Sequence, residues 1–171
     1  MKISDIKIAI ARKKLLALAE KPHGKSFSRK IGVILDSEDE KCFNAFLGLK
    51  QDLNLKEQDF LPVMCMERHV SNVIFDTPVI SRKDFGWNGK PGEAAAAFVN
   101  SEYDVLISFT AEENKMADFL VSVSRARLKV GRKTEDKKGI FDLNISAEQS
   151  SPEVFITELK KYLKIINTTT A

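Results

Sequence analysis

The sequence predicts an α/β fold: a single three-layer, Rossmann-like domain with a mainly parallel sheet of about 5–6 strands and an added basic helix at the N-terminus. Three observations predict it. Short apolar segments of strand length alternate with segments of helical composition along most of the chain. The strand-like segments are apolar throughout, which is typical of a parallel sheet covered on both faces. A length of 171 residues suits one buried core better than two.

The clearest unit spans residues 101–132. Residues 104–109 are predicted to form a buried strand, residues 114–125 a helix, and residues 127–130 a second strand. A strand, a helix and a second strand in one compact pass form the unit from which parallel sheets are built, and its crossover is almost always right-handed. This unit indicates the fold class and carries no catalytic motif.

Residues 3–20 are predicted to form a helix, because Ala, Leu, Lys and Ile dominate and neither Gly nor Pro occurs before Pro22. The apolar residues of this helix form two lines. One line contains Ile3, Ile6, Ile10 and Ala17, and the other contains Ile8, Ala11, Leu15 and Leu18. Two lines predict two contact surfaces, the helix's own domain and a second molecule, although ordinary packing on the core is the commoner origin of such a pattern.

The other elements follow from apolar runs, turn residues and caps. Strands are predicted at residues 31–35, 60–66, 78–80 and 140–145, and helices at residues 38–54, 92–100 and 151–167. Ser37 is the expected N-cap of the first of these helices, and Ser151 followed by Pro152 marks the start of the last. The domain therefore spans residues 30–167, after a basic helix and linker at 1–29 and before a frayed tail at 168–171.

Positive charge is concentrated in two regions. Residues 1–30 carry nine basic and two acidic side chains, a net charge of +7, whereas the whole chain has a net charge of only +3. The expected anion-binding patch combines the helix with the second region: Arg12, Lys13, Lys14, Arg125, Arg127, Lys129 and Lys133. Such patches contact nucleic acid, for example ribosomal RNA, or an anionic membrane surface. Alternatively, Lys and Arg around residues 127–130 protect an edge strand from aggregation.

Four residues are candidates for binding a phosphorylated or nucleotide-linked small molecule: Ser37, Thr110, Asn114 and Arg132. They follow predicted strands, and ligands of parallel α/β sheets bind at the carboxyl ends of strands. Arginine binds phosphate through paired hydrogen bonds. The acids in the turn at residues 36–38 argue the other way, because they would repel a pyrophosphate.

No familiar catalytic motif occurs. The sequence contains no Gly-x-Gly-x-x-Gly, no Gly-x-Ser-x-Gly and no Walker loop, and Pro91 follows Lys90 where a Walker loop has Ser or Thr. His23 and His69 are isolated, without neighbours at metal-ligand spacing. No catalytic residue, cofactor or metal ligand is therefore predicted, and a non-catalytic binding protein is favoured over an enzyme.

The two cysteines, Cys42 and Cys65, lie in apolar surroundings without a motif, which predicts buried free thiols in a reducing compartment. A cytoplasmic location is the expectation. The chain contains no apolar stretch of about 18 residues, so no membrane-spanning segment is expected.

Several segments together resemble an uncharacterised bacterial family from the Bacteroidetes lineage, a domain of unknown function. These segments are residues 84–91, 103–107, 124–132, 141–145 and 162–167. The resemblance covers nearly the whole chain and implies no activity.

Residues 101–132 also resemble part of the N-terminal domain of heptosyltransferase-type glycosyltransferases, in which a similar strand precedes a helix and a basic strand ending in Gly. Those enzymes have two Rossmann-like domains and hold the nucleotide-sugar mainly with the second. This chain has room for one such domain, and it has Ser108 where those strands usually have Asp. The resemblance therefore implies a ligand-binding half without transferase activity.

Overall fold

The computed structural model describes residues 3–18, 30–36, 39–66, 77–132 and 139–170. Several of the residues discussed above lie outside these ranges: Ser37, Lys133, His23 and His69.

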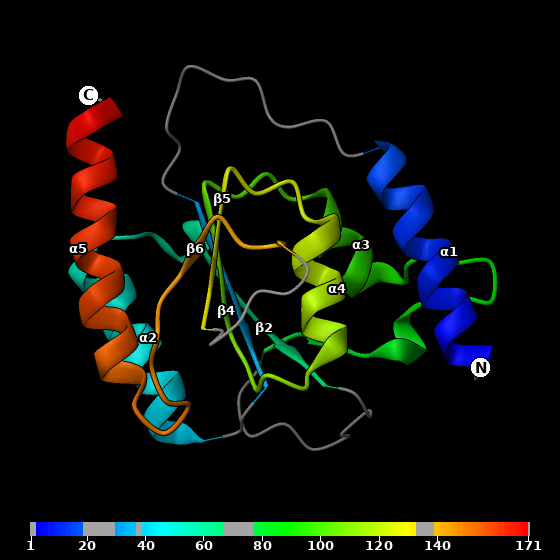
Figure 1. Cartoon of the computed structure of the whole chain (residues 1–171), viewed down its shortest axis with the longest axis horizontal. Coiled ribbons are helices and arrows are strands. Elements are labelled where there is room, and N and C mark those ends of the chain that lie inside the picture. Colours follow the sequence, from blue (N-terminus) through cyan, green and yellow to red (C-terminus); the bar gives the residue numbers. More distant parts are fainter. Residues whose placement is uncertain (1–2, 19–29, 37–38, 67–76, 133–138, 171) are drawn as a thin grey trace.

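The described strands form one six-stranded sheet in the order β3-β2-β1-β4-β5-β6, and every neighbouring pair is parallel. The strands are β1 (Ile31–Leu35), β2 (Phe60–Cys65), β3 (Val79–Ile80), β4 (Val105–Phe109), β5 (Leu128–Gly131) and β6 (Leu143–Asn144). The predicted parallel, Rossmann-like α/β fold is confirmed (Figure 1).

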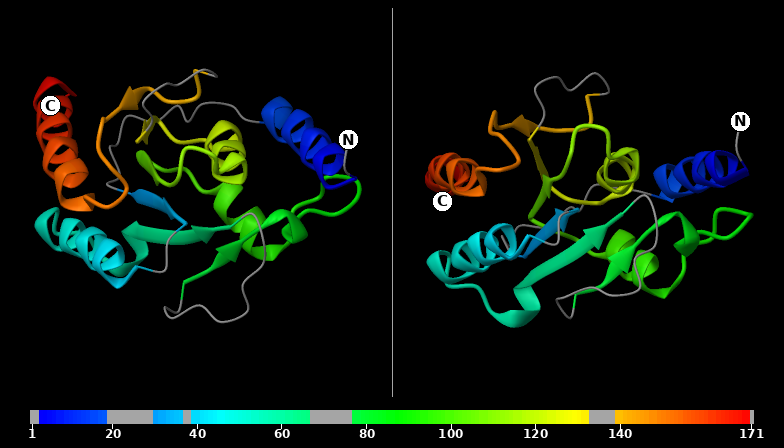
Figure 2. Two further views of the ribbon diagram at one scale, coloured as in Figure 1. Left: turned by 60° about the horizontal axis from the view of Figure 1, so that its bottom comes forward. Right: turned by 90° about the horizontal axis from the view of Figure 1, so that it is seen from below.

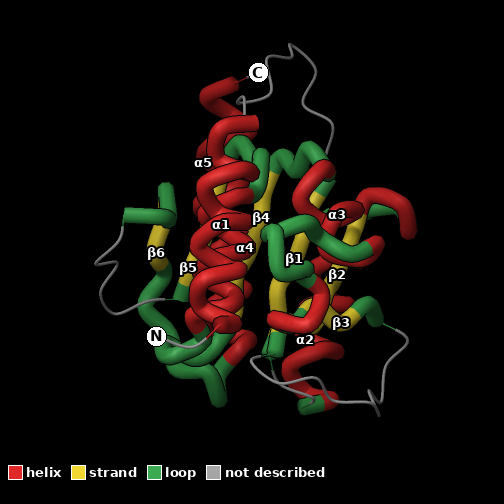
Figure 3. The backbone as a smooth tube through the Cα atoms, turned by 90° about the vertical axis from the view of Figure 1, so that its right-hand side faces the viewer, coloured by secondary structure: helices red, strands yellow, loops and turns green. Residues whose placement is uncertain are grey.

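Helices cover both faces of this sheet. One face carries α2 (Glu40–Asp52) and α5 (Pro152–Thr170), and the other carries α3 (Glu93–Asn100) and α4 (Lys115–Val123). Figure 2 shows these layers from two further sides. The N-terminal helix α1 (Ile3–Leu18) lies outside α4, as a further layer on that side, and Figure 3 shows it across the front of the molecule. Two short 3-10 helices complete the set, η1 (Glu57–Asp59) and η2 (Arg82–Asp84).

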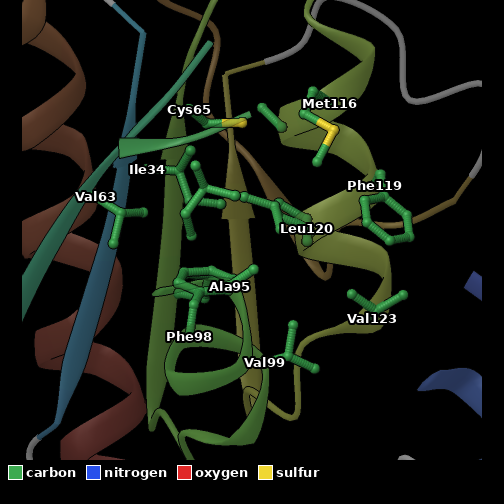
Figure 4. Packing of buried hydrophobic residues seen from close by; sticks show 14 of the residues in the cluster. Ile34, Val63, Cys65, Ala95, Phe98, Val99, Met116, Phe119, Leu120 and Val123 are labelled. Atoms are coloured by element: carbon green, nitrogen blue, oxygen red, sulfur yellow. The ribbon is translucent and has the colours of Figure 1, made fainter. Parts of the chain in front are cut away.

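Successive side chains of each strand point to opposite faces of the sheet, so the sheet lies between two apolar clusters. In β1, Val33 and Leu35 belong to the cluster beneath α2 and α5, whereas Ile34 belongs to the cluster beneath α3 and α4. Figure 4 shows the second cluster, with Ile34 and Leu120 pointing into the space between the sheet and the helices. Burial on both faces explains why the strand sequences are apolar throughout.

Three sequence predictions differ from the structure. The N-cap of α2 is Asp39, whose side chain accepts a hydrogen bond from the Lys41 amide, so the prediction of Ser37 as the cap is wrong. Strand β6 has two residues rather than six, because only Leu143 and Asn144 align with β5. Strand β5 is not an edge strand, because β6 lies beside it.

Other predictions are confirmed. Cys42 and Cys65 are free and buried. Helix α5 begins at Pro152 as expected and runs to Thr170, into the residues predicted to form a frayed tail. Among the described residues, no helix is both long enough and apolar enough to cross a membrane.

Gly32 in β1 makes room for the buried ring of Tyr103. A Cβ at residue 32 would lie 2.8 Å from Cε1 of that ring, which also packs against Phe98 with ring centroids 5.4 Å apart. The Lys30 ammonium also packs on this ring, 5.8 Å from its centroid, and Tyr103 is 2% exposed.

We therefore predict that Gly32→Ala lowers the free energy of unfolding by about 1–3 kcal/mol, the usual cost of overpacking a core. Gly48→Ala is the matched control, since a Cβ at residue 48 in α2 would meet no atom within 4 Å. This control should stabilise the protein by about 0.5–1 kcal/mol through helix propensity. Urea unfolding measures both changes, and an unchanged midpoint for Gly32→Ala would contradict the close Gly32–Tyr103 packing.

Candidate functional site

The strand order creates a switch point between β1 and β4. From β1 the chain proceeds to β2 and β3 on one side of the sheet, and from β4 it proceeds to β5 and β6 on the other. Ligands of open α/β sheets bind in the crevice at the carboxyl ends of strands at such a point. Three predicted site residues lie here: Thr110 after β4, Asn114 at the start of α4, and Arg132 after β5. The fourth, Ser37, lies outside the described residues.

Asp36 links this region together, a role that the sequence analysis missed. It follows β1 directly, and its Oδ2 accepts hydrogen bonds from the Ala111 amide at 2.7 Å and from Asn114 Nδ2 at 3.1 Å. Its Oδ1 accepts a hydrogen bond from Gln149 Nε2 at 2.7 Å. One carboxylate therefore joins the end of β1, the turn after β4, the cap of α4 and the segment before α5.

Asn114 connects the same cluster to β2. Its Oδ1 accepts a hydrogen bond from the Ala117 amide at 3.0 Å, which caps α4, and its Nδ2 donates to the carbonyl of Cys65 at 3.1 Å as well as to Asp36. Asn114 is 6% exposed. Buried amide groups need such partners, so this side chain has a clear structural role.

Arg132 holds the other end of the peptide group that Asp36 binds. Its Nη2 donates to the carbonyl of Thr110 at 2.8 Å, and Nη1 donates to the carbonyl of Ala147 at 3.0 Å. The N–H of that same Thr110–Ala111 peptide group donates to Asp36. A cation and an anion thus bind opposite ends of one peptide group, and the two hydrogen bonds polarise it in the same direction.

The predicted residues are therefore brought together, but most of their polar atoms already have partners elsewhere in the protein, and only the bond from Arg132 to the Thr110 carbonyl joins two of them. The Thr110 hydroxyl lies 3.2 Å from the Ser108 hydroxyl, and both residues are buried. Within the described part of the chain, Arg132 Nε is buried without a hydrogen-bond partner. A ligand at the carboxyl ends of β1 and β4 would have to displace existing hydrogen bonds.

Cys42, in α2, is not activated as a nucleophile. Burial raises the pKa of its thiol to about 12, and the negative charges of Asp39 and Asp36 act in the same direction. The reactive form of cysteine is the thiolate, which this environment disfavours.

The residues of the predicted anion-binding patch fall into two groups. On α1, the Arg12 guanidinium lies over the ring of Phe119 at 5.6 Å, and Lys13 is exposed. After α4, Arg127 pairs with the buried carboxylate of Asp104 at 3.7 Å. Two further residues of the patch, Arg125 and Lys129 in β5, are half-buried. The side chain of Lys14 and all of Lys133 lie outside the described residues.

A second feature of α1 is its apolar outer face. Ile8 and Ala11 are buried against the core, whereas Ile6 is 45% and Leu16 is 48% exposed. The two predicted apolar lines thus face different surroundings: the line of Ile8 and Ala11 packs on the domain, and Ile6, from the other line, is open to solvent.

The loop at residues 86–91 lies beside α1 and carries the single tryptophan of the chain, Trp87, which is 84% exposed. Gly89 has φ +77°, and a Cβ there would lie 2.6 Å from the backbone nitrogen of Ala11, so the loop backbone touches the helix. Figures 1 and 2 agree in placing this loop next to α1. The turn residues of the loop were visible in the sequence, but the exposure of Trp87 was not.

Comparison with known proteins identifies the family. Residues 7–166 match a family described as "Family of unknown function (DUF6913)". The chain belongs to DUF6913. The match includes most of α1, so the helix lies within the family's region together with the sheet. No curated protein and no solved structure matches this DUF6913 chain.

The hydrogen bonds of Asp36 to Ala111, Asn114 and Gln149 should contribute measurably to stability. We predict that Asp36→Ala lowers the free energy of unfolding by about 2–4 kcal/mol, because it leaves several donors, including the Ala111 amide, without their acceptor. Glu102→Ala, the loss of an exposed acid, should change it by less than about 0.5 kcal/mol. Chemical unfolding measures both, and equal effects of the two substitutions would show that the Asp36 hydrogen bonds contribute little.

Proposed function

We propose that this protein is a non-catalytic binding protein that docks on an anionic membrane surface through the outer face of α1 and the adjoining loop at residues 86–91. The observation that carries the proposal is that Ile6, Lys13 and Leu16 of α1, and Trp87 of the adjoining loop, are all exposed. Exposed apolar side chains grouped with basic ones are typical of helices that lie in the membrane interface.

Charge supports an anionic partner. The first 30 residues have a net charge of +7, and α1 itself contains Lys7, Lys13 and Lys14 against Asp5, in addition to Arg12, which packs on Phe119. A basic side chain near an anionic leaflet contributes about 1 kcal/mol to binding. The predicted cytoplasmic location would make the inner leaflet the relevant surface.

The apolar side chains favour a membrane over nucleic acid. Ile6 and Leu16 gain nothing from phosphate groups, but they lose contact with water when they enter the headgroup region. Trp87 suits the same region, because tryptophan combines a large apolar ring with a polar N–H. The further residues of the proposed patch, Arg125, Arg127 and Lys129, would extend the basic surface.

Trp87 makes the test direct, since all tryptophan fluorescence of the protein comes from this one residue. We predict that vesicles containing phosphatidylglycerol shift its emission to shorter wavelength, that phosphatidylcholine vesicles do so much less, and that raising salt from about 50 mM to about 500 mM reverses the shift. Lys13→Glu should weaken vesicle binding about 30-fold, since it changes the charge by two units at about 1 kcal/mol each.

Lys56→Glu is the matched control: the same charge reversal at an exposed site next to η1, which should leave binding nearly unchanged. Absence of any emission shift with anionic vesicles would overturn the proposal. Binding of RNA at about 50 mM salt without vesicle binding would instead assign the basic surface to nucleic acid. A specific protein that binds through α1 in place of vesicles would assign it to a protein partner.

A second candidate function is the binding of a phosphorylated or nucleotide-linked small molecule at the carboxyl ends of β4 and β5. The meeting of Thr110, Asn114 and Arg132 at the switch point favours it, as does the resemblance to one domain of heptosyltransferase-type enzymes. A thermal-shift screen with nucleotides and nucleotide-sugars tests it. Stabilisation that saturates at millimolar ligand and disappears in Arg132→Met would support this candidate, and no stabilisation would eliminate it.

A further inference from the structure

A cavity of about 410 Å³ lies beside β2, near the end of the strand order that is opposite to β5 and β6. It exists because β3 pairs only with Met64 and Cys65, the last two residues of β2. The amino-terminal part of β2 is thus left without a paired strand among the described residues on that side. The walls come from α2 and α3, which lie on opposite faces of the sheet.

The lining is mainly apolar. It includes Phe43 and Leu47 from α2, Phe60 and Pro62 from β2, and Phe98 from α3. The volume lies within the range of about 300–1,000 Å³ that small-molecule sites occupy, and such sites are usually apolar with a few polar groups that orient the ligand. Pro62 has no N–H, which makes this edge a poor template for an added strand. A compact apolar molecule therefore fits the cavity better than an extended peptide does.

Lys50 is the one cation among the described residues that line the cavity, and its present ion-pair partner is exposed. The Lys50 side chain is 16% exposed, and its ammonium group pairs with Glu57, whose side chain is 90% exposed. Because an exposed carboxylate gains little from such a pair, a ligand carboxylate can replace it at small cost. Ser101 and Tyr103 form a polar region of the lining. Burial raises the pKa of Tyr103 to about 12, although its hydrogen bond with Ser101 acts in the opposite direction. The phenol is therefore neutral at neutral pH.

We propose that this cavity binds an apolar carboxylate, a medium-chain fatty acid, with the chain against Phe43, Phe60 and Phe98 and the carboxylate on Lys50 in place of Glu57. The chemistry follows from the lining: the space is mainly apolar, and its largely buried cation is paired with an exposed carboxylate that a ligand can replace, which favours an apolar molecule with one negative charge. The cavity is lined by no residue of α1 and not by Trp87, so this proposal does not depend on the proposal of membrane docking.

Calorimetric titration of the whole chain with octanoate, decanoate and decan-1-ol, below the concentrations at which they form micelles, tests the proposal. Decanoate should bind at least tenfold more tightly than decan-1-ol of equal chain length. It should also bind more tightly than octanoate, by up to about fourfold for each buried methylene group. No binding of decanoate, or equal binding of decanoate and decan-1-ol, would overturn the proposal.

Two substitutions at the ion pair should act in opposite directions. Lys50→Met keeps the apolar stem and removes the charge, so it should abolish the preference for decanoate over decan-1-ol. Glu57→Gln removes the competing carboxylate from an exposed position, so it should tighten decanoate binding several-fold without affecting folding. If neither substitution changes decanoate affinity, the carboxylate does not bind at Lys50.

Ala97→Trp locates the site. Ala97 lines the cavity from α3 and is exposed, so a larger side chain there can fill the cavity without disturbing the core. This variant should lose both decanoate and decan-1-ol binding while keeping the melting temperature of the wild type within a few degrees. Unchanged decanoate binding by a folded Ala97→Trp variant would show that the ligand binds elsewhere.

Discussion

The carboxylate of Asp36 is the constraint on which the centre of this structure depends. Parallel strands end with backbone groups that need partners, and buried amides without partners are costly. Asp36 accepts the Ala111 amide, while Arg132 donates to the carbonyl of the same peptide group. Through Asn114 and Gln149 the carboxylate also fixes α4 and the segment before α5. Among the described residues, the strand ends at which such folds bind cofactors are thus joined by the protein's own hydrogen bonds.

The fold of this chain does not by itself indicate its function. A Rossmann-like sheet supports many activities, and only the groups at a site decide which one is present. Among the described residues, most polar groups at the switch point are paired within the protein. Exposed apolar and basic residues occur on α1, Trp87 is exposed in the adjoining loop, and an apolar cavity lies beside β2. In the two proposals made above, the central sheet supports two separate outer surfaces, one for an anionic membrane and one for an apolar carboxylate. Membership of DUF6913 assigns no activity.

Local sequence signals predicted most of the fold but little of the site. The bounds of β1 and the start of α5 at Pro152 agree with the structure, because an unbroken apolar run and a Ser-Pro pair are strong local signals. The prediction for β6 was too long, since pairing depends on a neighbour as well as on composition. The role of Asp36 depends on contacts 75, 78 and 113 residues away, which periodicity does not encode. The sequence predicted that Thr110, Asn114 and Arg132 follow the carboxyl ends of strands, but it could not show that their polar atoms have partners within the protein, Asp36 among them.

The central claim, that Asp36 closes the switch point from within, can be measured at a single amide. Hydrogen exchange of the Ala111 N–H, followed by NMR, reports whether its bond to Asp36 persists in solution. We expect this amide to exchange slowly, at a rate close to that of β4 amides, and Asp36→Ala to accelerate it far more than it accelerates the amides of β4. Rapid exchange of Ala111 in the wild-type protein, at the rate of an exposed loop, would contradict the claim and leave the switch point open for a ligand.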